Sequence, residues 1–353
     1  MSRPSCLIYD LYLDTLGGGE RVIFAVAEAL QNDFEVTVAA PHLPERSRLA
    51  KFGMNPNVAM QRMHPARFTA ASRRADLVVY LANGVPMPSL ARRSLLFLQF
   101  PFNKLSRSCV LRSVERRVLA GYQPIVYSEF VAHWARCRLA IDPVVLHPPA
   151  QLGTYDASTK EPLILSIGRF FSAEHTKRHD VLIEAHRRLP RSIRDRWPLV
   201  LAGGLYRGDG GTSYLDRLHH LARGDNVRFE VDVSDQRLRE LLSQASLFWH
   251  ATGFGRDSGQ PEKAEHFGLS TIEAMSWGAV PLVYADGGQL EIVSPGTGVL
   301  WQSIAELVQA TQGLIDEPAR RLAEAKRAAI RALDFDPSDF QREIRLLAQE
   351  TSV

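Results

Sequence analysis

The chain has 353 residues, of which 45% are hydrophobic and 23% are charged, so it has the composition of a globular protein long enough for two domains. No apolar run reaches the roughly 18–20 residues of a membrane-spanning helix, and the early Asp10 indicates a first strand rather than a signal peptide. Cys6, Cys109 and Cys137 form no CxxC pair and indicate free thiols in a reducing compartment. We therefore expect a cytoplasmic protein.

The formal net charge of +3 is unevenly distributed along the chain. Residues 1–150 contain 18 Lys and Arg against 11 Asp and Glu, whereas the remainder contains 24 against 28. Many of these arginines lie in residues 62–74 and 102–117. A basic half can contact an anionic membrane, an acidic acceptor or nucleic acid, and a solvated helix surface explains it equally well. We expect no nucleic-acid partner and keep peripheral contact with the inner face of an anionic membrane as a hypothesis.

Short apolar runs alternate with helical patterns from the N-terminus onward. Residues 20–30 and 177–189 have apolar side chains at helical spacing. The apolar runs read as strands that are buried on both faces, and the alternation predicts parallel sheets covered by helices. These runs lie at residues 5–10, 35–40, 77–81, 94–100, 124–128, 163–168, 197–204, 245–250 and 279–285.

The alternation pauses at residues 144–162, which are rich in Pro, Gly, Ser and Thr and read as a linker. We therefore predict two doubly wound α/β domains, residues 1–150 and 160–335, and a C-terminal helix in 336–353 that packs back on the first domain. Ligands of such sheets bind at the carboxyl ends of strands, next to helix N-termini. The strand-to-helix loops are therefore the places to look for chemistry.

The first such loop contains Gly17, Gly18 and Gly19. Three glycines let the backbone approach a ligand closely, and the following helix start offers N–H groups to an anion. Glu20 follows directly, so the loop does not match the GxGxxG dinucleotide pattern. A tight flexible turn is the structural alternative.

The second loop follows the strand that ends near Gly168. Arg169 and Lys177 would place two cations at the carboxyl edge of a sheet, which suits a diphosphate, although surface cations are often only solvated. His175 and His179 are four residues apart but lack the glutamate of a zinc-protease helix. We expect no metal site there.

The third loop, residues 253–268, is polar and glycine-rich and precedes a helix that starts near residue 269. The dipole and free N–H groups of that helix could hold a phosphate. Glu273 fits a capping box with Ser270, or else its carboxylate accepts hydrogen bonds from vicinal sugar hydroxyls. Glu265 lies before the helix and cannot join that box.

The pattern E-x₇-E with HFG inside it, followed by EAM…G…P and GG…EIV, resembles the retaining glycosyltransferases of family 4, which have the GT-B fold. GGGER near the start and GRFF at the second domain fit in order and spacing. The resemblance spans nearly the whole chain and is most specific in residues 163–293. Within the family, the motifs resemble the subset that includes dolichol-linked mannosyltransferases and bacterial relatives. It implies two Rossmann-like domains facing across a cleft, with the acceptor bound by the first and a nucleotide sugar by the second.

The resemblance also implies roles for individual residues. Arg169 and Lys177 would bind the donor diphosphate, Glu265 the transferred sugar and Glu273 the ribose. The base would lie near Val231 and Val233. The glycine loop and the N–H groups at the start of the third-loop helix would meet the phosphates. The implied donor-binding set is Gly17, Gly18, Gly19, Arg169, Lys177, Val231, Val233, Glu265, Phe267, Gly268, Leu269, Ser270 and Glu273, with Arg169, Lys177 and Glu265 as the catalytic residues.

One position departs from the resemblance. Relatives often have histidine where this chain has Gln99, on the acceptor and sugar side of the site. Glutamine can donate a hydrogen bond to a sugar hydroxyl but cannot become cationic. His133 and His147 are candidate substitutes, although lone histidines are more often structural.

The resulting hypothesis is a retaining hexosyltransferase that needs no metal and no cofactor and uses a UDP- or GDP-sugar as its donor. Charge on the leaving diphosphate would be stabilised by the two cations and the helix N-terminus. The acceptor would be a glycan, a glycolipid or a small natural product. The one DxD pattern, Asp334 to Asp336, precedes Pro337 and the final helix, and we interpret Asp336 or Ser338 as the cap of that helix.

Two alternatives remain open at this stage. A nucleotide-sugar epimerase or hydrolase with the same architecture would use no acceptor and would release free sugar. A non-catalytic sugar-nucleotide binding protein is disfavoured, because a decayed site would lose some of its cations and acids.

Overall fold

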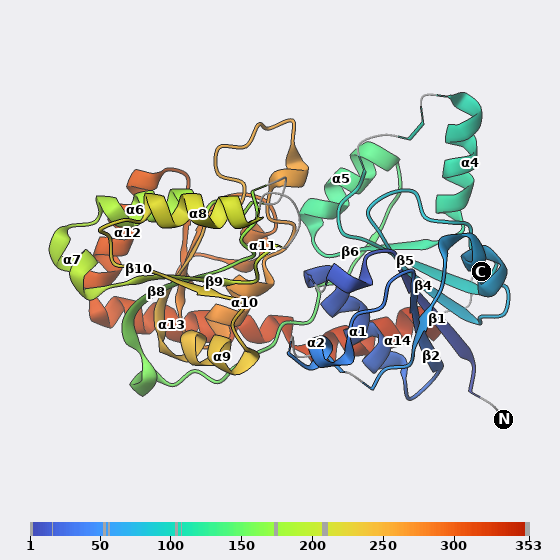
Figure 1. Cartoon of the computed structure of the whole chain (residues 1–353), viewed down its shortest axis with the longest axis horizontal. Coiled ribbons are helices and arrows are strands. Elements are labelled where there is room, and N and C mark those ends of the chain that lie inside the picture. The colour runs from blue at the N-terminus through green and yellow to red at the C-terminus, as the bar shows by residue number, and fades with distance from the viewer. Residues whose placement is uncertain are drawn as a thin grey trace. The chain divides into compact units, whose positions relative to one another are not determined.

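The computed structural model describes residues 3–15, 17–51, 54–55, 57–102, 105–106, 108–172, 176–206 and 211–349. The chain divides into two compact units, Met1–Pro149 with Pro337–Val353, and Ala150–Asp336. Each unit is built on one parallel sheet with helices on both faces (Figure 1). The predicted fold class, two Rossmann-like doubly wound parallel-sheet domains, is confirmed.

The first unit contains a seven-stranded sheet in the order β3-β2-β1-β4-β5-β6-β7, and all its strand pairs are parallel. Its central strands are apolar throughout because helices cover both faces. Helices α1 and α14 pack together, whereas α3, α4 and α5 contribute to the core that contains Tyr9 and Tyr80. The strands are β1 Ser5–Asp10, β2 Glu35–Ala40, β3 Met60–Arg62, β4 Leu77–Ala82, β5 Arg93–Leu98, β6 Gln123–Val126 and β7 Val144–Val145; the helices are α1 Gly18–Leu30, α2 Arg46–Lys51, α3 Phe68–Ser72, α4 Cys109–Ala120, α5 Glu129–Leu139 and α14 Pro337–Gln349.

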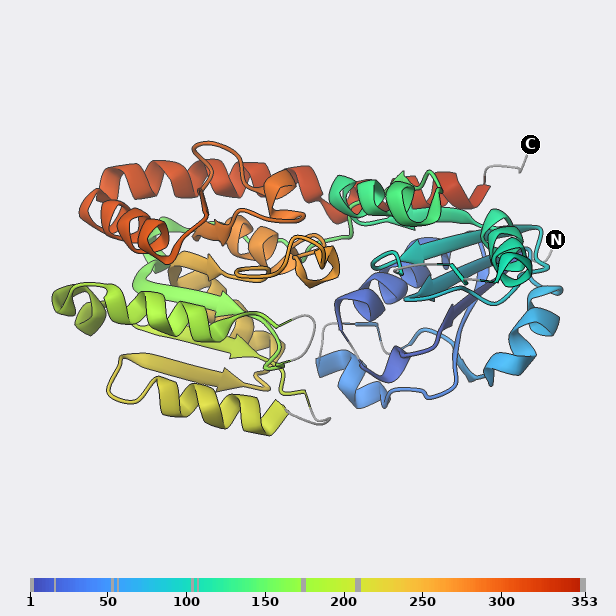
Figure 2. The same cartoon turned by 90° about the horizontal axis from the view of Figure 1, so that it is seen from above.

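The second unit contains a six-stranded parallel sheet in the order β10-β9-β8-β11-β12-β13, and Figure 2 shows these strands side by side. One face packs against α6, α8 and α12, and the other packs against α9 and α10 (Figure 1). The strands are β8 Glu161–Ile167, β9 Leu199–Gly203, β10 Val227–Val231, β11 Ala245–His250, β12 Val280–Tyr284 and β13 Val299–Trp301; the helices are α6 His179–Arg188, α7 Arg191–Arg196, α8 Gly211–Leu221, α9 Asp235–Gln244, α10 Leu269–Ser276, α11 Gln289–Ile292, α12 Ile304–Asp316 and α13 Pro318–Ala332.

The stretch interpreted as a linker is shorter than residues 144–162. Val144 and Val145 form β7 at the edge of the first sheet, and β8 already begins at Glu161. The Pro, Gly, Ser and Thr residues between β7 and β8 led us to include β7 and the first residues of β8 in the predicted linker. At the other end of the chain, α14 packs on α1, and Arg345 Nε donates to the carbonyl oxygen of Ala29 at 2.9 Å.

None of the helices in the described ranges is long and apolar enough to cross a membrane.

Candidate functional site

The strand order of the second sheet brings β8 and β11 together at its centre. The chain after β8 enters α6 on one face of the sheet, and the chain after β11 enters α10 on the other. Such a reversal is the point where ligands of open parallel sheets bind, at the carboxyl ends of the strands. The loop before α6 carries Arg169 and Lys177, and the loop before α10 carries Glu265.

Lys177 and Glu265 join these two loops. Lys177 Nζ donates to Glu265 Oε2 at 2.5 Å, although the residues are 88 positions apart, and the side chains are only 22% and 13% exposed. Gly168 makes room for the lysine, because a Cβ at that position would lie 2.4 Å from Lys177 Cγ. The ion pair therefore joins a residue that was predicted to bind the diphosphate, Lys177, to one that was predicted to bind the transferred sugar, Glu265.

His250, the last residue of β11, is the third member of this cluster and contacts Glu265. Its Nε2 lies 2.9 Å from Glu265 Oε2 and 3.2 Å from Thr252 Oγ1, and its Nδ1 lies 3.4 Å from Gln289 Nε2. Burial lowers the pKa of His250, so the ring is neutral near pH 7. A neutral ring that donates from Nε2 to the carboxylate and accepts at Nδ1 from the amide satisfies these contacts.

Glu265 is held in its charged form. Burial alone would raise its pKa, but the charge of Lys177 and the hydrogen bond from His250 keep the pKa well below the usual 4.5. Both contacts use Oε2, so Oε1 has no hydrogen-bond donor among the described residues. A partly exposed carboxylate oxygen with free lone pairs can accept a hydrogen bond from a sugar hydroxyl.

Arg169 lies at the end of β8 and is exposed. Within the described ranges its guanidinium has no hydrogen-bond or ion-pair partner. It is therefore a cation available to an anionic ligand at the carboxyl edge of the sheet.

The helix after Glu265 begins two residues earlier than a capping box with Ser270 as its N-cap requires. α10 starts at Leu269, and its N-cap is Gly268, which has φ +126° and no side-chain cap. A side chain at Gly268 would also meet Gln289, because a Cβ would lie 2.7 Å from Nε2. The capping box of Ser270 with Glu273 is therefore wrong, since only glycine fits the position that starts the helix. The first N–H groups of α10, those of Leu269 and Ser270, are without intrahelical acceptors.

Glu273 and Phe267 are both buried in this unit. Glu273 is 4% exposed, and its Oε1 lies 3.5 Å from the backbone nitrogen of Gln151. Phe267 is 3% exposed, and its ring packs edge-to-face on Phe335, with ring centroids 5.7 Å apart.

The edge of the second sheet continues through the ends of β9 and β10. Val231 ends β10, and Val231 and Val233 are both half-buried. Between them, Asp232 has φ +52°, and its Oδ1 accepts a hydrogen bond from the Leu205 nitrogen at 2.9 Å. This contact fixes the backbone where the base was predicted to lie.

In the first unit, the predicted glycine loop and Gln99 lie together. Gly17 is the N-cap of α1, and its nitrogen donates to the carboxylate of Glu20. A Cβ on Gly19 would lie 1.7 Å from Gln99 Nε2, so the helix start approaches the Gln99 side chain as closely as only glycine allows. The Gln99 amide has no hydrogen-bond partner among the described residues and remains available to a ligand.

The remaining candidates are scattered. His133 lies on α5, 3.7 Å from Cys137 Sγ, and His147 follows β7. His175 is outside the described residues. Asp334 pairs with Arg331 at 2.5 Å. The described residues contain no group of three or more His, Cys, Asp or Glu side chains that could hold a metal ion.

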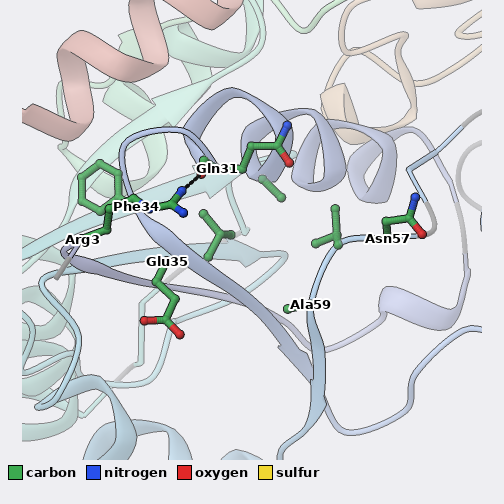
Figure 3. A pocket seen from close by; sticks show the side chains of 9 residues that line it. Arg3, Gln31, Phe34, Glu35, Asn57 and Ala59 are labelled. Carbon is green, nitrogen blue, oxygen red and sulfur yellow. Dashed lines mark hydrogen bonds between the residues drawn. The ribbon is translucent and has the colours of Figure 1, made fainter.

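Two cavities differ in their position on the sheets. A cavity of about 370 Å³ in the first unit is lined by Arg3, Gln31, Glu35 and Asn57, at the amino ends of the strands (Figure 3). A cavity of about 500 Å³ in the second unit is lined by polar groups that include Thr176 and Arg178, on either side of Lys177 in the sequence, and Gln260 and Lys263, from the loop that leads to Glu265. Only the second lies at the carboxyl edge, where ligands of parallel sheets bind.

Sequence reasoning missed His250, Thr252 and Gln289. The one available signal was that His250 ends a fully buried apolar strand just before the polar loop. A buried polar side chain at that place needs a partner, and that partner is Glu265.

The ion pair makes a measurable prediction. In a double-mutant cycle of Lys177→Met and Glu265→Gln, followed by urea unfolding, we expect a coupling of about 1.5–3 kcal/mol at pH 7, because both members are largely buried and charged. Since the pKa of Glu265 is lowered in the folded state, the coupling should hold above the usual 4.5 and be lost as the pH falls through the lowered value. A coupling of zero at pH 7 would show that the pair does not hold the two loops together.

The sequence model of the family described as glycosyl transferases group 1 matches residues 152–331, just over half of the chain. A GDP-Man:Man(3)GlcNAc(2)-PP-Dol alpha-1,2-mannosyltransferase of Dictyostelium discoideum is 26% identical over 226 residues, which cover 57% of this chain and 41% of that protein. A GDP-mannose:cellobiosyl-diphosphopolyprenol alpha-mannosyltransferase of Komagataeibacter xylinus is 30% identical over 181 residues, which cover 50% of this chain and 39% of that protein. The chain thus spans about two fifths of the length of these curated relatives.

Among solved structures, Anabaena HepE in complex with UDP-glucose superposes with a TM-score of 0.74 at 18% identity, over 98% of this chain and 99% of that chain. This likeness shows that the two parallel-sheet domains are those of the GT-B fold. Together with the family match over the unit that contains Arg169, Lys177, Glu265 and Glu273, it leads to one conclusion. The chain belongs to the glycosyl transferases group 1 family.

Proposed function

We propose that the protein is a retaining, metal-independent glycosyltransferase that moves a hexose-type sugar from a nucleoside-diphosphate sugar to an acceptor hydroxyl. The observation that carries the proposal is the buried Glu265 carboxylate, which is fixed by Lys177 and His250 and keeps Oε1 free. Family membership supports the same reaction class.

The donor site would follow the carboxyl edge of the second sheet. Arg169 and Lys177 supply cations for the diphosphate, and the first N–H groups of α10 supply donors for the distal phosphate and the sugar. Glu265 would accept sugar hydroxyls, and the cavity of about 500 Å³, which is lined by residues of the loops that carry Lys177 and Glu265, would be space for substrate. Glu273 would accept the ribose hydroxyls, and the base would lie at Val231 and Val233.

The first unit would contribute the acceptor side. Gly17, Gly18 and Gly19 would contact the donor phosphates, and the free Gln99 amide would donate to a sugar hydroxyl. Because glutamine stays neutral, we assign Gln99 to binding and not to proton transfer.

The reaction would proceed by front-face substitution. The acceptor oxygen bonds to the anomeric carbon while the bond from that carbon to the phosphate oxygen breaks. A diphosphate oxygen then takes the acceptor's proton. Negative charge grows on the leaving diphosphate, where Arg169, Lys177 and the α10 N–H groups stabilise it more strongly than in the ground state. This arrangement needs no metal ion and no further cofactor.

We propose a UDP- or GDP-sugar as the donor, since the two curated relatives are named for GDP-mannose and HepE was solved with UDP-glucose. The acceptor is a glycan, a glycolipid or a small molecule; the relatives' names favour a glycan on a lipid diphosphate. With such an acceptor the enzyme would work in the cytoplasm, peripherally at an anionic membrane.

Arg169→Ala should lower kcat/KM roughly tenfold to more than a hundredfold, because it removes a charge-assisted contact worth about 1.5–3 kcal/mol to the diphosphate. Release of nucleoside diphosphate in the presence of acceptor measures the rate. Arg228→Ala, at another exposed arginine of the same unit, is the matched control and should leave the rate unchanged. Equal rates for wild type and Arg169→Ala would remove the diphosphate assignment, and free sugar released without acceptor would favour a hydrolase.

Glu273→Gln should weaken binding of bare UDP or GDP by about 1.5–3 kcal/mol, because one acceptor oxygen becomes a donor and the charge is lost. Calorimetric titration measures this directly. Glu265→Gln should leave the affinity for the bare nucleotide unchanged, since we assign Glu265 to the missing sugar. Unchanged affinity of Glu273→Gln would return that carboxylate to a structural role beside Gln151.

A further inference from the structure

The chain between β11 and Glu265, residues 253–264, is called the β11 loop here, and its middle part cannot be held by hydrophobic burial. Near its start, Phe254 packs on Tyr284 and Trp301, with ring centroids 5.3 and 5.4 Å away, and near its end Pro261 is buried. Between them lies the sequence GRDSGQ, residues 255–260, which contains no apolar side chain larger than glycine. Polar contacts must fix this stretch, because ordering it costs conformational entropy that no apolar burial offsets.

Arg256 supplies those polar contacts. Its Nε and one terminal nitrogen donate to the two carboxylate oxygens of Asp286, at 2.5 and 2.8 Å, and the two side chains are only 16% and 15% exposed. Its other terminal nitrogen donates to the carbonyl oxygens of Asp257 at 3.1 Å and Ser258 at 3.4 Å. The planar guanidinium therefore binds the middle of the β11 loop to itself and to the chain after β12.

The short segment after β12 that contains Asp286 also contacts both ends of the β11 loop. A Cβ on Gly253 would lie 2.7 Å from Asp286 Oδ2, so the start of the loop runs against this carboxylate. The nitrogen of Gly288 donates to the carbonyl oxygen of Glu265 at 2.8 Å, and a Cβ on Gly287 would lie 2.1 Å from the same oxygen. Residues 286–288 thus hold the loop at its start, in its middle and at Glu265.

The β11 loop forms much of the proposed substrate space. Most residues that line the cavity of about 500 Å³ belong to this loop, among them Gly255, Gln260 and Lys263. Glu265 follows the loop directly in the chain. A displacement of the loop would therefore change both the wall of the cavity and the backbone that carries the Glu265 carboxylate.

We propose that Arg256 and Asp286 are positioning residues for the transferred sugar. Their ion pair fixes the β11 loop, and the loop in turn sets the cavity wall and the position of Glu265, whereas the nucleotide is bound without it. The inference rests on the proposed function only in taking the occupant of the cavity to be the sugar of the donor.

Hydrogen–deuterium exchange of the full chain without ligand tests the structural step. Arg256→Lys keeps the charge but loses the planar fork, and Asp286→Asn keeps the shape but loses the charge. Each should raise amide exchange in residues 255–264 on the order of tenfold or more and leave the rest of the second unit unchanged. The matched control is Arg194→Gln, which removes a partly buried ion pair with Asp225, at 3.2 Å, on the amino side of the same sheet. It should leave exchange in the β11 loop unchanged.

Calorimetric titration of the same variants tests the functional step. Arg256→Lys and Asp286→Asn should weaken binding of whichever of UDP-glucose and GDP-mannose wild type binds, on the order of tenfold, and leave the affinity for bare UDP and GDP unchanged. The double variant should be no weaker than the weaker single variant, because both substitutions remove one shared interaction. Arg194→Gln should change neither affinity.

The outcomes separate this inference from the proposed function. Unchanged exchange in the β11 loop, or equal weakening of the nucleotide sugar and the bare nucleotide, would overturn the inference and leave the glycosyl-transfer proposal standing. Wild type that binds neither nucleotide sugar would count against both, whereas raised exchange confined to the β11 loop would still show that the ion pair fixes it.

Discussion

The site depends on a carboxylate that stays charged although it is largely buried. Glu265 is 13% exposed at its side chain, and an isolated charge there would be costly. Lys177 supplies the opposite charge from the loop after β8, and His250 supplies a hydrogen bond from the end of β11. These two strands are neighbours only because the strand order reverses at the centre of the second sheet. The topology of the sheet therefore positions the chemistry.

Close backbone packing is the second requirement, and glycine meets it in each unit. Gly19 lets the start of α1 approach Gln99, and Gly268 starts α10 with a positive φ beside Gln289. In each case a Cβ would collide with an amide that faces a helix N-terminus. Because these two glycines have no Cβ, the start of each helix can lie close to a glutamine amide.

Most of the fold could be predicted from the sequence, because its strands are buried on both faces and read as uninterrupted apolar runs. Four strands were not predicted: β3, β7 and β13 have only two or three residues, and β10 has no fully buried residue, so none of them gives a recognisable apolar run. Arg169, Lys177 and Glu265 could be singled out by their loops. The ion pair between Lys177 and Glu265 could not be predicted, because the two residues are 88 positions apart in the sequence. The helix start near residue 269 was predicted, but the glycine N-cap at Gly268 was not, because the capping-box pattern of Ser270 and Glu273 is easier to recognise than a glycine cap.

The most direct test of the central claim, that the second unit holds a nucleoside-diphosphate sugar without metal, is a thermal-shift screen of the full chain with UDP- and GDP-sugars in excess EDTA. Ligand that binds only the folded protein raises its stability, by about 2.7 kcal/mol at a hundredfold excess over Kd. The account predicts a rise in Tm with at least one of these sugars, and a smaller rise with the same ligand for Glu265→Gln. No rise with any of them, or a rise that appears only when Mg²⁺ or Mn²⁺ is restored, would contradict it.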